Sequence, residues 1–123
     1  MPRALVVDDS RAMRIIVGKA LREFGFEVSE AVNGLEAITC LQQGPEFNIV
    51  LCDWNMPVMN GLDMVRTVRS DDRFGNVRIC MVTTETELAQ MDLALEAGAN
   101  AYIMKPFTKE VIEQKLRSLG VFA

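Results

Sequence analysis

Five short β-type segments alternate with five helical patterns along the chain, and this alternation constrains the fold more than any other feature. The first, third and fourth β-type segments are rich in Val, Ile and Leu, with little alternation of polar residues. Such a composition is typical of strands that are covered on both faces. The second segment, EVSEA, is more polar and suits the edge of a sheet. We expect strands over residues 4–8, 27–31, 48–53, 78–83 and 101–104.

The helical patterns lie between these strands and after the last one. The first pattern has Ser10 as its N-cap and Gly25 as its stop signal, and Asn33 is the expected N-cap of the second. The second to fifth helices are expected over residues 34–43, 61–70, 85–97 and 108–119. Strands that alternate with helices in this way imply right-handed crossovers. They predict an α/β fold with a doubly wound, parallel, five-stranded (βα)5 sheet.

The length and charge of the chain limit its class. Its 123 residues fit one domain, which we expect to span residues 1–123. The net charge of -4 argues against binding to nucleic acid, because phosphate backbones attract basic surfaces. No apolar run approaches the ~20 residues of a membrane span, and the first residues lack the long apolar stretch of a signal peptide. We therefore expect a soluble cytoplasmic protein with neither nucleic-acid nor membrane partners.

The absence of histidine from the sequence restricts the chemistry. Without histidine, the chain cannot build a Ser or Cys triad with a His base, a His-ligated zinc site or a phosphohistidine of its own. The three cysteines form no CxxC pair, and Cys52 and Cys80 lie in apolar runs, so we expect thiols of the core. Any chemistry here depends on carboxylates, lysine and hydroxyl groups.

Polar side chains collect where the predicted strands end. These residues are Asp8, Asp9, Asp53, Thr83, Thr84 and Lys105. The carboxyl ends of parallel strands share one edge of a sheet, and open α/β folds bind their ligands there. Three carboxylates placed together repel one another and need a cation. Oxygen ligands without His or Cys favour Mg²⁺ over zinc.

Asp53 is the candidate nucleophile of this cluster. A carboxylate can accept a phosphoryl group and form an aspartyl phosphate. Mg²⁺ bound to Asp9 and Asp53 would neutralise charge as the phosphoryl group arrives. Lys105 would pair with one phosphoryl oxygen, and the Thr83 hydroxyl would donate to another. The cluster therefore has the groups that phosphoryl transfer requires.

Four motifs carry a family resemblance that covers essentially the whole chain. They are VVDDS at 6–10, DWNMPVMNG at 53–61, MVTTE at 81–85 and AYIMKPF at 101–107, each at the exit of a predicted strand. With these motifs the sequence resembles the receiver domain of bacterial response regulators, and within that family the CheY-type chemotaxis regulators. The resemblance implies a flavodoxin-like, CheY-like sheet with strand order 2-1-3-4-5.

The resemblance implies a role for each residue of the acidic site. Asp53 is the expected phospho-acceptor. Asp8 and Asp9 are the expected acidic pair for Mg²⁺, with Asp53 and the backbone carbonyl of Asn55 as further ligands. Lys105 is expected to contact the phosphoryl group, and the family typically has a cis peptide bond between this lysine and the following proline.

The resemblance also implies a switch. Thr83 is the expected switch hydroxyl, which moves toward the phosphoryl group, and Tyr102 is the expected aromatic switch, which then turns inward. Asn55 and Glu85 match positions that tune autodephosphorylation and phosphatase access. A changed surface over the fourth helix, fifth strand and fifth helix would then contact partners. Its expected residues are Leu88, Met91, Asn100, Tyr102, Met104 and Lys115.

These roles describe a signalling protein rather than an enzyme with a separate substrate. A CheA-like histidine kinase is the expected phosphoryl donor, and small donors such as acetyl phosphate often serve in this family. The acceptor is expected to hydrolyse its own acyl phosphate slowly. The expected output partner is a flagellar switch protein or another output protein, and a phosphatase is a further candidate. We expect a monomer that acts by protein–protein contact in chemotaxis and flagellar motor control.

Other functions fit parts of the pattern. A phosphorelay shuttle would pass its phosphoryl group on to a histidine phosphotransfer protein, and this flow distinguishes it from an output regulator. A Mg²⁺-dependent phosphohydrolase of the haloacid dehalogenase type would place a DxD motif after the first strand, where this chain has Asp8 and Asp9 in succession. A flavodoxin needs a hydroxyl- and glycine-rich phosphate loop at that point, and two aspartates would repel the FMN phosphate.

Two residues beside the acidic site stand out. Thr84 lies where the family usually has Ala, Gly or Ser. We expect its β-branched side chain to narrow access to the phosphoryl site and to slow phosphorylation by small donors. Trp54, next to the expected acceptor, is expected to lie exposed on the loop, where its fluorescence would report Mg²⁺ or phosphoryl binding.

Overall fold

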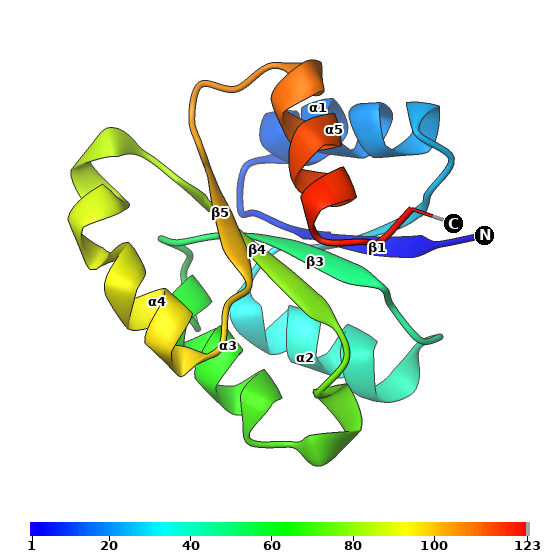
Figure 1. The fold of residues 1–123 in the computed structure, drawn as a ribbon. Coiled ribbons are helices and arrows are strands. Elements are labelled where there is room, and N and C mark those ends of the chain that lie inside the picture. The colour runs from blue at the N-terminus through cyan, green and yellow to red at the C-terminus, as the bar shows by residue number, and fades with distance from the viewer. Residues whose placement is uncertain (123) are drawn as a thin grey trace.

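A parallel five-stranded sheet forms the centre of the computed structural model, which describes residues 1–122 apart from the side chain of Glu85 (Figure 1). The strands are β1 (Arg3–Val7), β2 (Glu27–Ala31), β3 (Ile49–Asp53), β4 (Arg78–Thr83) and β5 (Ala101–Met104). Their order is β2-β1-β3-β4-β5, and every neighbouring pair is parallel. The predicted doubly wound fold and its strand order are confirmed.

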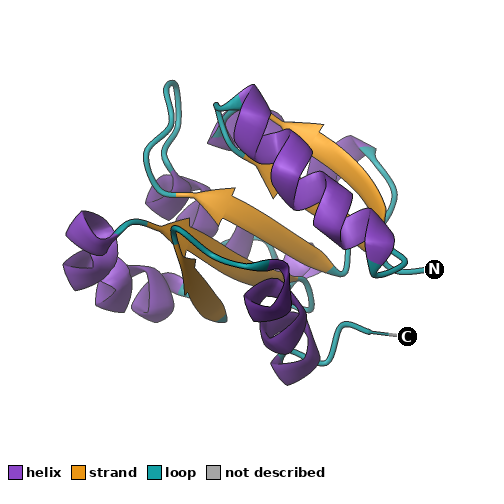
Figure 2. Ribbon diagram, turned by 90° about the horizontal axis from the view of Figure 1, so that it is seen from above, coloured by secondary structure: helices purple, strands orange, loops and turns teal. Residues whose placement is uncertain are grey.

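Helices cover both faces of this sheet (Figure 1, Figure 2). One face carries α1 (Arg11–Glu23) and α5 (Lys109–Ser118). The other face carries α2 (Gly34–Gln43), α3 (Gly61–Arg69) and α4 (Met91–Ala97). Two short 3-10 helices, η1 (Asp72–Phe74) and η2 (Glu85–Gln90), precede β4 and α4. Within residues 1–122, no helix combines the length and the apolar character needed to cross a membrane.

The two faces of the sheet bury separate hydrophobic cores. Successive residues of a strand point to opposite faces. Leu5 and Val7 of β1 therefore pack with α2 and α3, whereas Ala4 and Val6 pack with α1 and α5. Every residue of β3 is buried. This double coverage explains why the central strands are apolar without alternation, and it fixes their carboxyl ends firmly in place.

The first and third strands differ slightly from the prediction. β1 ends at Val7 rather than at Asp8, because the Asp8 carboxylate accepts a hydrogen bond from the N–H of Ser10 at 2.9 Å. This local bond turns the chain out of the strand. β3 begins one residue later than predicted, at Ile49. The side-chain oxygen of Asn48, just before it, accepts from the N–H of Arg3 at 2.8 Å.

The helix ends mostly follow the sequence signals. Ser10 and Asn33 are N-caps as predicted, since their side chains accept from the N–H groups of the third residue that follows each. Three residues that we expected inside helices are cap residues instead. They are Ser70 at the end of α3, and Thr108 and Leu119 at the two ends of α5.

The predicted fourth helix is divided in two. The sequence predicted one helix over residues 85–97, but η2 occupies Glu85–Gln90 and the α-helix begins only at Met91. At the start of η2 the hydroxyls of Thr84 and Thr86 lie 2.9 Å apart and hydrogen-bond to each other. Local side-chain bonds of this kind compete with α-helical geometry, and 3-10 turns are frequent at helix N-termini.

Val58 takes an unusual backbone conformation in the loop between β3 and α3. Its φ is 70°, a left-handed value that β-branched residues rarely adopt. The N–H of Met59 donates to the carbonyl of Pro57 at 2.7 Å, so Val58 is the centre of a tight three-residue turn. The Val58 side chain is 76% exposed, so packing contributes little to offset the strain.

Replacing Val58 with glycine should stabilise the fold. Glycine adopts positive φ freely, so Val58→Gly should raise the free energy of unfolding by about 1 kcal/mol, the net of relieved strain and added chain entropy. Chemical denaturation measures this change. The control is Val32→Gly, at an exposed valine whose φ is not positive, and it should destabilise. Equal or lower stability for Val58→Gly would contradict the assignment of strain.

Candidate functional site

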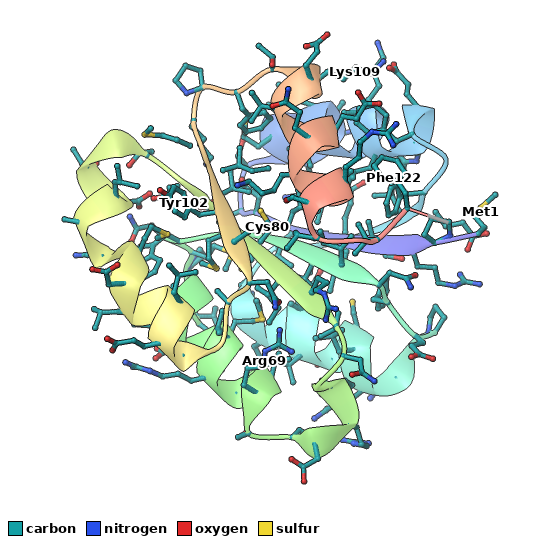
Figure 3. All side chains as sticks on the ribbon, in the orientation of Figure 1. Met1, Arg69, Cys80, Tyr102, Lys109 and Phe122 are labelled. Carbon is teal, nitrogen blue, oxygen red and sulfur yellow. The ribbon has the colours of Figure 1, made fainter. Side chains whose placement is uncertain are left out.

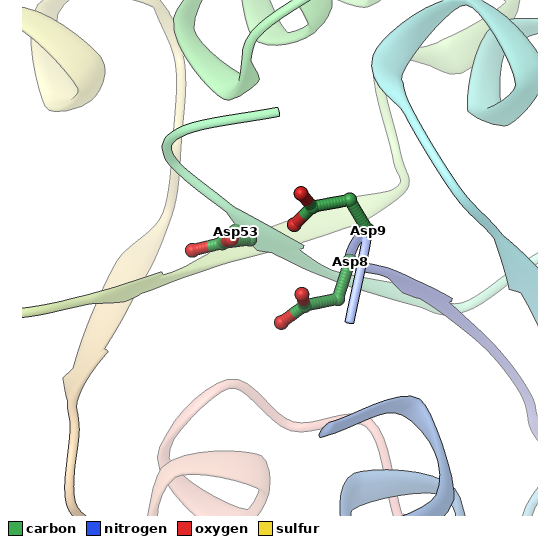
Figure 4. Close-up of side chains that lie close together, drawn as sticks. All are labelled: Asp8, Asp9 and Asp53. Carbon is green, nitrogen blue, oxygen red and sulfur yellow. The ribbon is translucent and has the colours of Figure 1, made fainter. Parts of the chain in front are cut away.

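Three aspartates meet at the carboxyl edge of the sheet (Figure 4). The pair Asp8 and Asp9 follows β1, and Asp53 ends β3. One carboxylate oxygen from each of the three lies within 4.8 Å of the others. The register of the sheet explains this, because Val7 pairs with Cys52 and the aspartates come directly after these partners. The structure therefore brings together the acidic cluster that the strand ends predicted.

Lys105 supplies the positive charge of the site. Its Nζ atom lies 3.2 Å from Oδ1 of Asp53 and 3.6 Å from Oδ2 of Asp8. Lys105 directly follows β5, and its backbone N–H donates to the carbonyl of Thr83 at 2.6 Å. The peptide bond from Lys105 to Pro106 is cis, as the sequence resemblance implied. The lysine thus reaches the aspartates from the end of β5, at the same edge of the sheet.

Burial and repulsion set the electrostatics of the site. Asp8 and Asp53 are buried, with 5% and 8% of their surface exposed, whereas Asp9 is exposed. Burial and the nearby charge of Asp8 raise the pKa of Asp53, against the opposing effects of Lys105 and of the Trp54 N–H. Burial disfavours the charged form of Lys105, but the attraction of Asp53 and Asp8 outweighs it and raises the pKa of Lys105.

The donor set fits a hard cation. The clustered side-chain ligands are all carboxylate oxygens, from Asp8, Asp9 and Asp53. Among the described residues, the Lys105 ammonium pairs with two of these three carboxylates, so negative groups outnumber positive ones in the cluster. Carboxylate oxygens are the protein ligands that Mg²⁺ and Ca²⁺ prefer. The cluster could therefore bind a metal ion of this class.

Asp53 is held in place by the chain that follows it. The N–H of Trp54 donates to Oδ1 of Asp53 at 2.9 Å, and the N–H of Gly61 donates to the carbonyl of Trp54 at 2.9 Å. A Cβ atom on Gly61 would lie 2.4 Å from the carbonyl oxygen of Asp53. Only glycine therefore lets α3 begin so close to the acceptor.

The prediction that Trp54 is exposed is wrong. Its side chain is only 7% exposed and packs in the core beneath α2 and α3. The physical reason is the close approach of Gly61, which folds the loop back over β3 and leaves the indole inside. The backbone N–H of Trp54 still donates to Asp53, so the residue is a buried rather than an exposed neighbour of the site.

Asp8 is positioned by contacts that the sequence analysis did not identify. Its carboxylate accepts from the N–H of Ser10, and its backbone carbonyl accepts from Nη1 of Arg14 at 2.8 Å. Arg14 in turn pairs with Glu30 on β2 at 2.9 Å. The arginine lies one turn into α1, and a basic residue there has no distinctive sequence signal.

Thr83 is fully buried and its hydroxyl donates to the carbonyl of Thr84 at 3.2 Å. The structure therefore places Thr83 at the edge shared with Asp53, through the pairing of β3 with β4. In this arrangement the hydroxyl is engaged by its own chain neighbour. It would have to leave that bond to donate to a group on Asp53.

Glu87 joins two loops of the site, and the sequence analysis missed it. Its Oε2 atom accepts from Nδ2 of Asn55, in the loop after β3. Its Oε1 atom accepts from the N–H of Thr84 at 3.0 Å and from the Thr84 hydroxyl at 3.1 Å. The spacing of Thr84 and Glu87 is that of a capping box, so this motif could have revealed the contact with Thr84 but not the one with Asn55.

The expected surface residues fall into three groups. Tyr102, labelled on β5 in Figure 3, is 37% exposed and its ring centre lies 6.0 Å from Nζ of Lys115, while Met104 is 40% exposed. Leu88 is half-buried against the core. The placement of Met91 on the surface is wrong, since this residue starts α4 and turns into the core with 3% exposure.

Two further expectations concern neighbours of this surface. The side-chain oxygen of Asn100 accepts from the N–H of Ile79 and from Nη2 of Arg69, both at 2.8 Å. Asn100 therefore ties α3 to the start of β5. The expected role of Glu85 depends on its side chain, which lies outside the described part of the structure.

Substitution of Asp53 should stabilise the fold. Because the pKa of Asp53 is raised, its ionised form costs folding energy at neutral pH. Asp53→Asn should therefore raise the free energy of unfolding by about 1 kcal/mol at pH 7. As pH falls, Asp53 becomes protonated in the folded protein before it does so in the unfolded chain. Its charge then no longer costs folding energy, so the gain should shrink as pH approaches the ordinary carboxyl range. Denaturant titrations across this pH range test the sign, and a loss of stability at pH 7 would contradict it.

Comparison with known proteins gives one consistent result. Residues 4–117 match the family described as the response regulator receiver domain. The chain is 49% identical over 115 residues to the chemotaxis protein CheY1 of Helicobacter pylori, a match that covers 93% of both proteins. It is 43% identical over 118 residues to the chemotaxis protein CheY homolog of Campylobacter jejuni, covering 95% of this chain and 91% of that protein.

Solved structures agree with the sequence matches. The chemotaxis response regulator CheY4 of Vibrio cholerae superposes with a TM-score of 0.90 at 34% identity, over 97% of this chain and 98% of that one. A CheY-like receiver domain protein from Methanospirillum hungatei gives a TM-score of 0.85 at 30% identity, over 98% and 94% of the two chains. The similarity thus extends over both sequence and fold along almost the whole chain.

Proposed function

Because this chain belongs to the response regulator receiver domain family, we propose that it is a CheY-type regulator that accepts a phosphoryl group on Asp53 and acts in chemotaxis. The observation that carries the proposal is the meeting of Asp53, Lys105 and the acidic pair at one edge of the sheet. The chemotaxis assignment is supported by the names of the similar proteins from three organisms.

In the proposed reaction, a carboxylate oxygen of Asp53 attacks the phosphorus of a phosphohistidine. An O–P bond forms on Asp53 while the P–N bond breaks and the imidazole leaves. The chain contains no histidine, so the phosphohistidine lies outside the chain, and a CheA-like histidine kinase is its proposed source. Lys105, which lies 3.2 Å from Oδ1 of Asp53, would pair with a phosphoryl oxygen.

Mg²⁺ is the proposed cofactor of this site. The carboxylates of Asp8, Asp9 and Asp53 and the backbone carbonyl of Asn55 would hold it. When bound, the ion would neutralise negative charge as the phosphoryl group arrives. The protein itself supplies the fixed geometry, because Asp53 is anchored by the Trp54 N–H and by the close packing of α3.

The proposed signal starts at Thr83. A phosphoryl group on Asp53 adds about two negative charges and strong acceptor oxygens. The Thr83 hydroxyl would then leave the Thr84 carbonyl and donate to one of these oxygens. Thr83 pairs with Met104, and its carbonyl accepts from the N–H of Lys105, so its movement would reach β5 directly. The exposed Tyr102 and Met104 would change the surface offered to a flagellar switch or other output protein.

Mass spectrometry tests the acceptor. After incubation with Mg²⁺ and acetyl phosphate, the wild type should gain the mass of one phosphoryl group, and Asp53→Asn should not. The matched control is Asp63→Asn, at an exposed aspartate in the first turn of α3, which should be labelled like the wild type. An unchanged wild-type mass, or equal labelling of Asp53→Asn, would contradict the proposal. Transfer of the label onward to a histidine phosphotransfer protein would instead indicate a phosphorelay shuttle.

The effect of Thr84 on the rate of phosphorylation can be divided between its methyl group and its hydroxyl group. Thr84 is half-buried, and its hydroxyl bonds to Thr86 and Glu87. Thr84→Ser removes the methyl group alone, so if bulk narrows access, phosphorylation by acetyl phosphate should become about twofold faster, the effect of a barrier lowered by about 0.5 kcal/mol. Thr84→Ala should be at least as fast. Rates that equal the wild type for both variants would show that Thr84 does not restrict access.

A further inference from the structure

One carboxylate connects the two loops that flank the acceptor. Oε2 of Glu87 accepts from the side chain of Asn55, two residues beyond Asp53. Oε1 accepts from both the N–H and the hydroxyl of Thr84, one residue beyond Thr83. Both oxygens of Glu87 are thus engaged, one by each loop. We call these three residues, Asn55, Glu87 and Thr84, the Glu87 bridge.

The Glu87 bridge restrains Thr83, the residue that is proposed to move. The Thr83 hydroxyl donates to the carbonyl of Thr84, and Glu87 holds that same residue through its N–H and hydroxyl. Any shift of the Thr83–Thr84 segment relative to the loop after β3 must therefore stretch or break bonds to Glu87. Hydrogen bonds to a charged group are stronger than those between neutral groups. The bridge thus stabilises the arrangement in which the Thr83 hydroxyl is bonded to the Thr84 carbonyl.

The charge of Glu87 also favours the unphosphorylated arrangement. Its negative charge adds to the attraction that Asp53 and Asp8 exert on the Lys105 ammonium, so Glu87 lies within electrostatic reach of the site. A phosphoryl group on Asp53 would bring about two further negative charges. Glu87 and the phosphoryl group would then repel each other.

Resting on the proposed function, we propose that Glu87 is a positioning residue that holds the receiver in its unphosphorylated arrangement by bridging Asn55 to Thr84. Phosphorylation then has to release the bridge before Thr83 can turn to the phosphoryl oxygens. Glu87 sets the free-energy difference between the two arrangements, and so the fraction of protein that responds to a given amount of donor.

Beryllofluoride, a mimic of the acyl phosphate, measures this difference at equilibrium. Its affinity in the presence of Mg²⁺ can be followed through the fluorescence of Trp54, the one tryptophan of the chain, whose backbone N–H donates to Asp53. Glu87→Ala removes both arms of the bridge and should tighten binding by about tenfold or more, the lower end of the range for loss of one hydrogen bond to a charged group. Glu87→Gln removes the charge but keeps an acceptor for Thr84, so its gain should be smaller.

Two comparisons isolate the bridge from other effects. Glu46→Ala, at an exposed glutamate before β3, carries the same change in charge far from the acceptor edge and should leave the affinity unchanged. In the background of Asn55→Ala, which already lacks one arm, the gain from Glu87→Ala should be smaller than in the wild type. Thermal unfolding confirms that each variant is folded. A purely structural role would lower stability without raising the affinity.

A spectroscopic signal tests the bridge directly. The side-chain amide resonances of Asn55, assigned by comparison with Asn55→Ala, should shift in Glu87→Ala, and they should shift likewise when the wild type binds beryllofluoride. Unchanged resonances in Glu87→Ala would show that the bridge is not formed.

The outcomes distinguish the two proposals. If the wild type neither binds beryllofluoride nor gains a phosphoryl group, the proposed function is wrong and the bridge has no role in it. If the wild type does both, but Glu87→Ala binds beryllofluoride no more tightly, the proposed role of Glu87 is overturned and the proposed function stands. Equal tightening in Glu87→Ala and Glu87→Gln would also overturn it, because charge without hydrogen bonding would then account for the effect.

Discussion

The burial of like charges at one edge of the sheet is the constraint on which the rest of the structure depends. Asp8 and Asp53 are buried beside each other, and the Lys105 ammonium lies within 4 Å of both. Two buried carboxylates that share one positive charge are unfavourable, so the fold must hold them there. The central strands do so because they are packed on both faces. The acidic cluster thus lowers the stability of the fold and, at the same time, forms a site that attracts cations.

The loops around these charges are linked to one another rather than free. The N–H of Lys105 donates to the carbonyl of Thr83, which connects β5 to β4, and Glu87 connects the start of η2 to the loop after β3. A change at Asp53 therefore meets several contacts that have to move together. Such linkage favours two discrete arrangements over a continuous range, and this is the behaviour that a switch requires.

Several features followed from the sequence because they depend on local pattern. Parallel strands place their carboxyl ends at one edge, so the positions of Asp8, Asp53 and Lys105 at strand ends predicted that they would share this edge, while the strand order came from the family resemblance. The errors arose where packing between elements decided the outcome. Trp54 follows a strand and precedes a polar loop, yet the packing of Gly61 against β3 turns its side chain inward.

Taken alone, the sequence determined the doubly wound sheet, the acidic edge and the exclusion of histidine chemistry, because periodicity and residue type suffice for these. The tertiary structure decided the rest. It divided the predicted fourth helix at Met91 and buried that residue, and it engaged the Thr83 hydroxyl with its own neighbour. It also brought Glu87 to Asn55, across 32 residues of sequence. This last contact arises only once packing has placed the two loops side by side, so no local pattern specifies it.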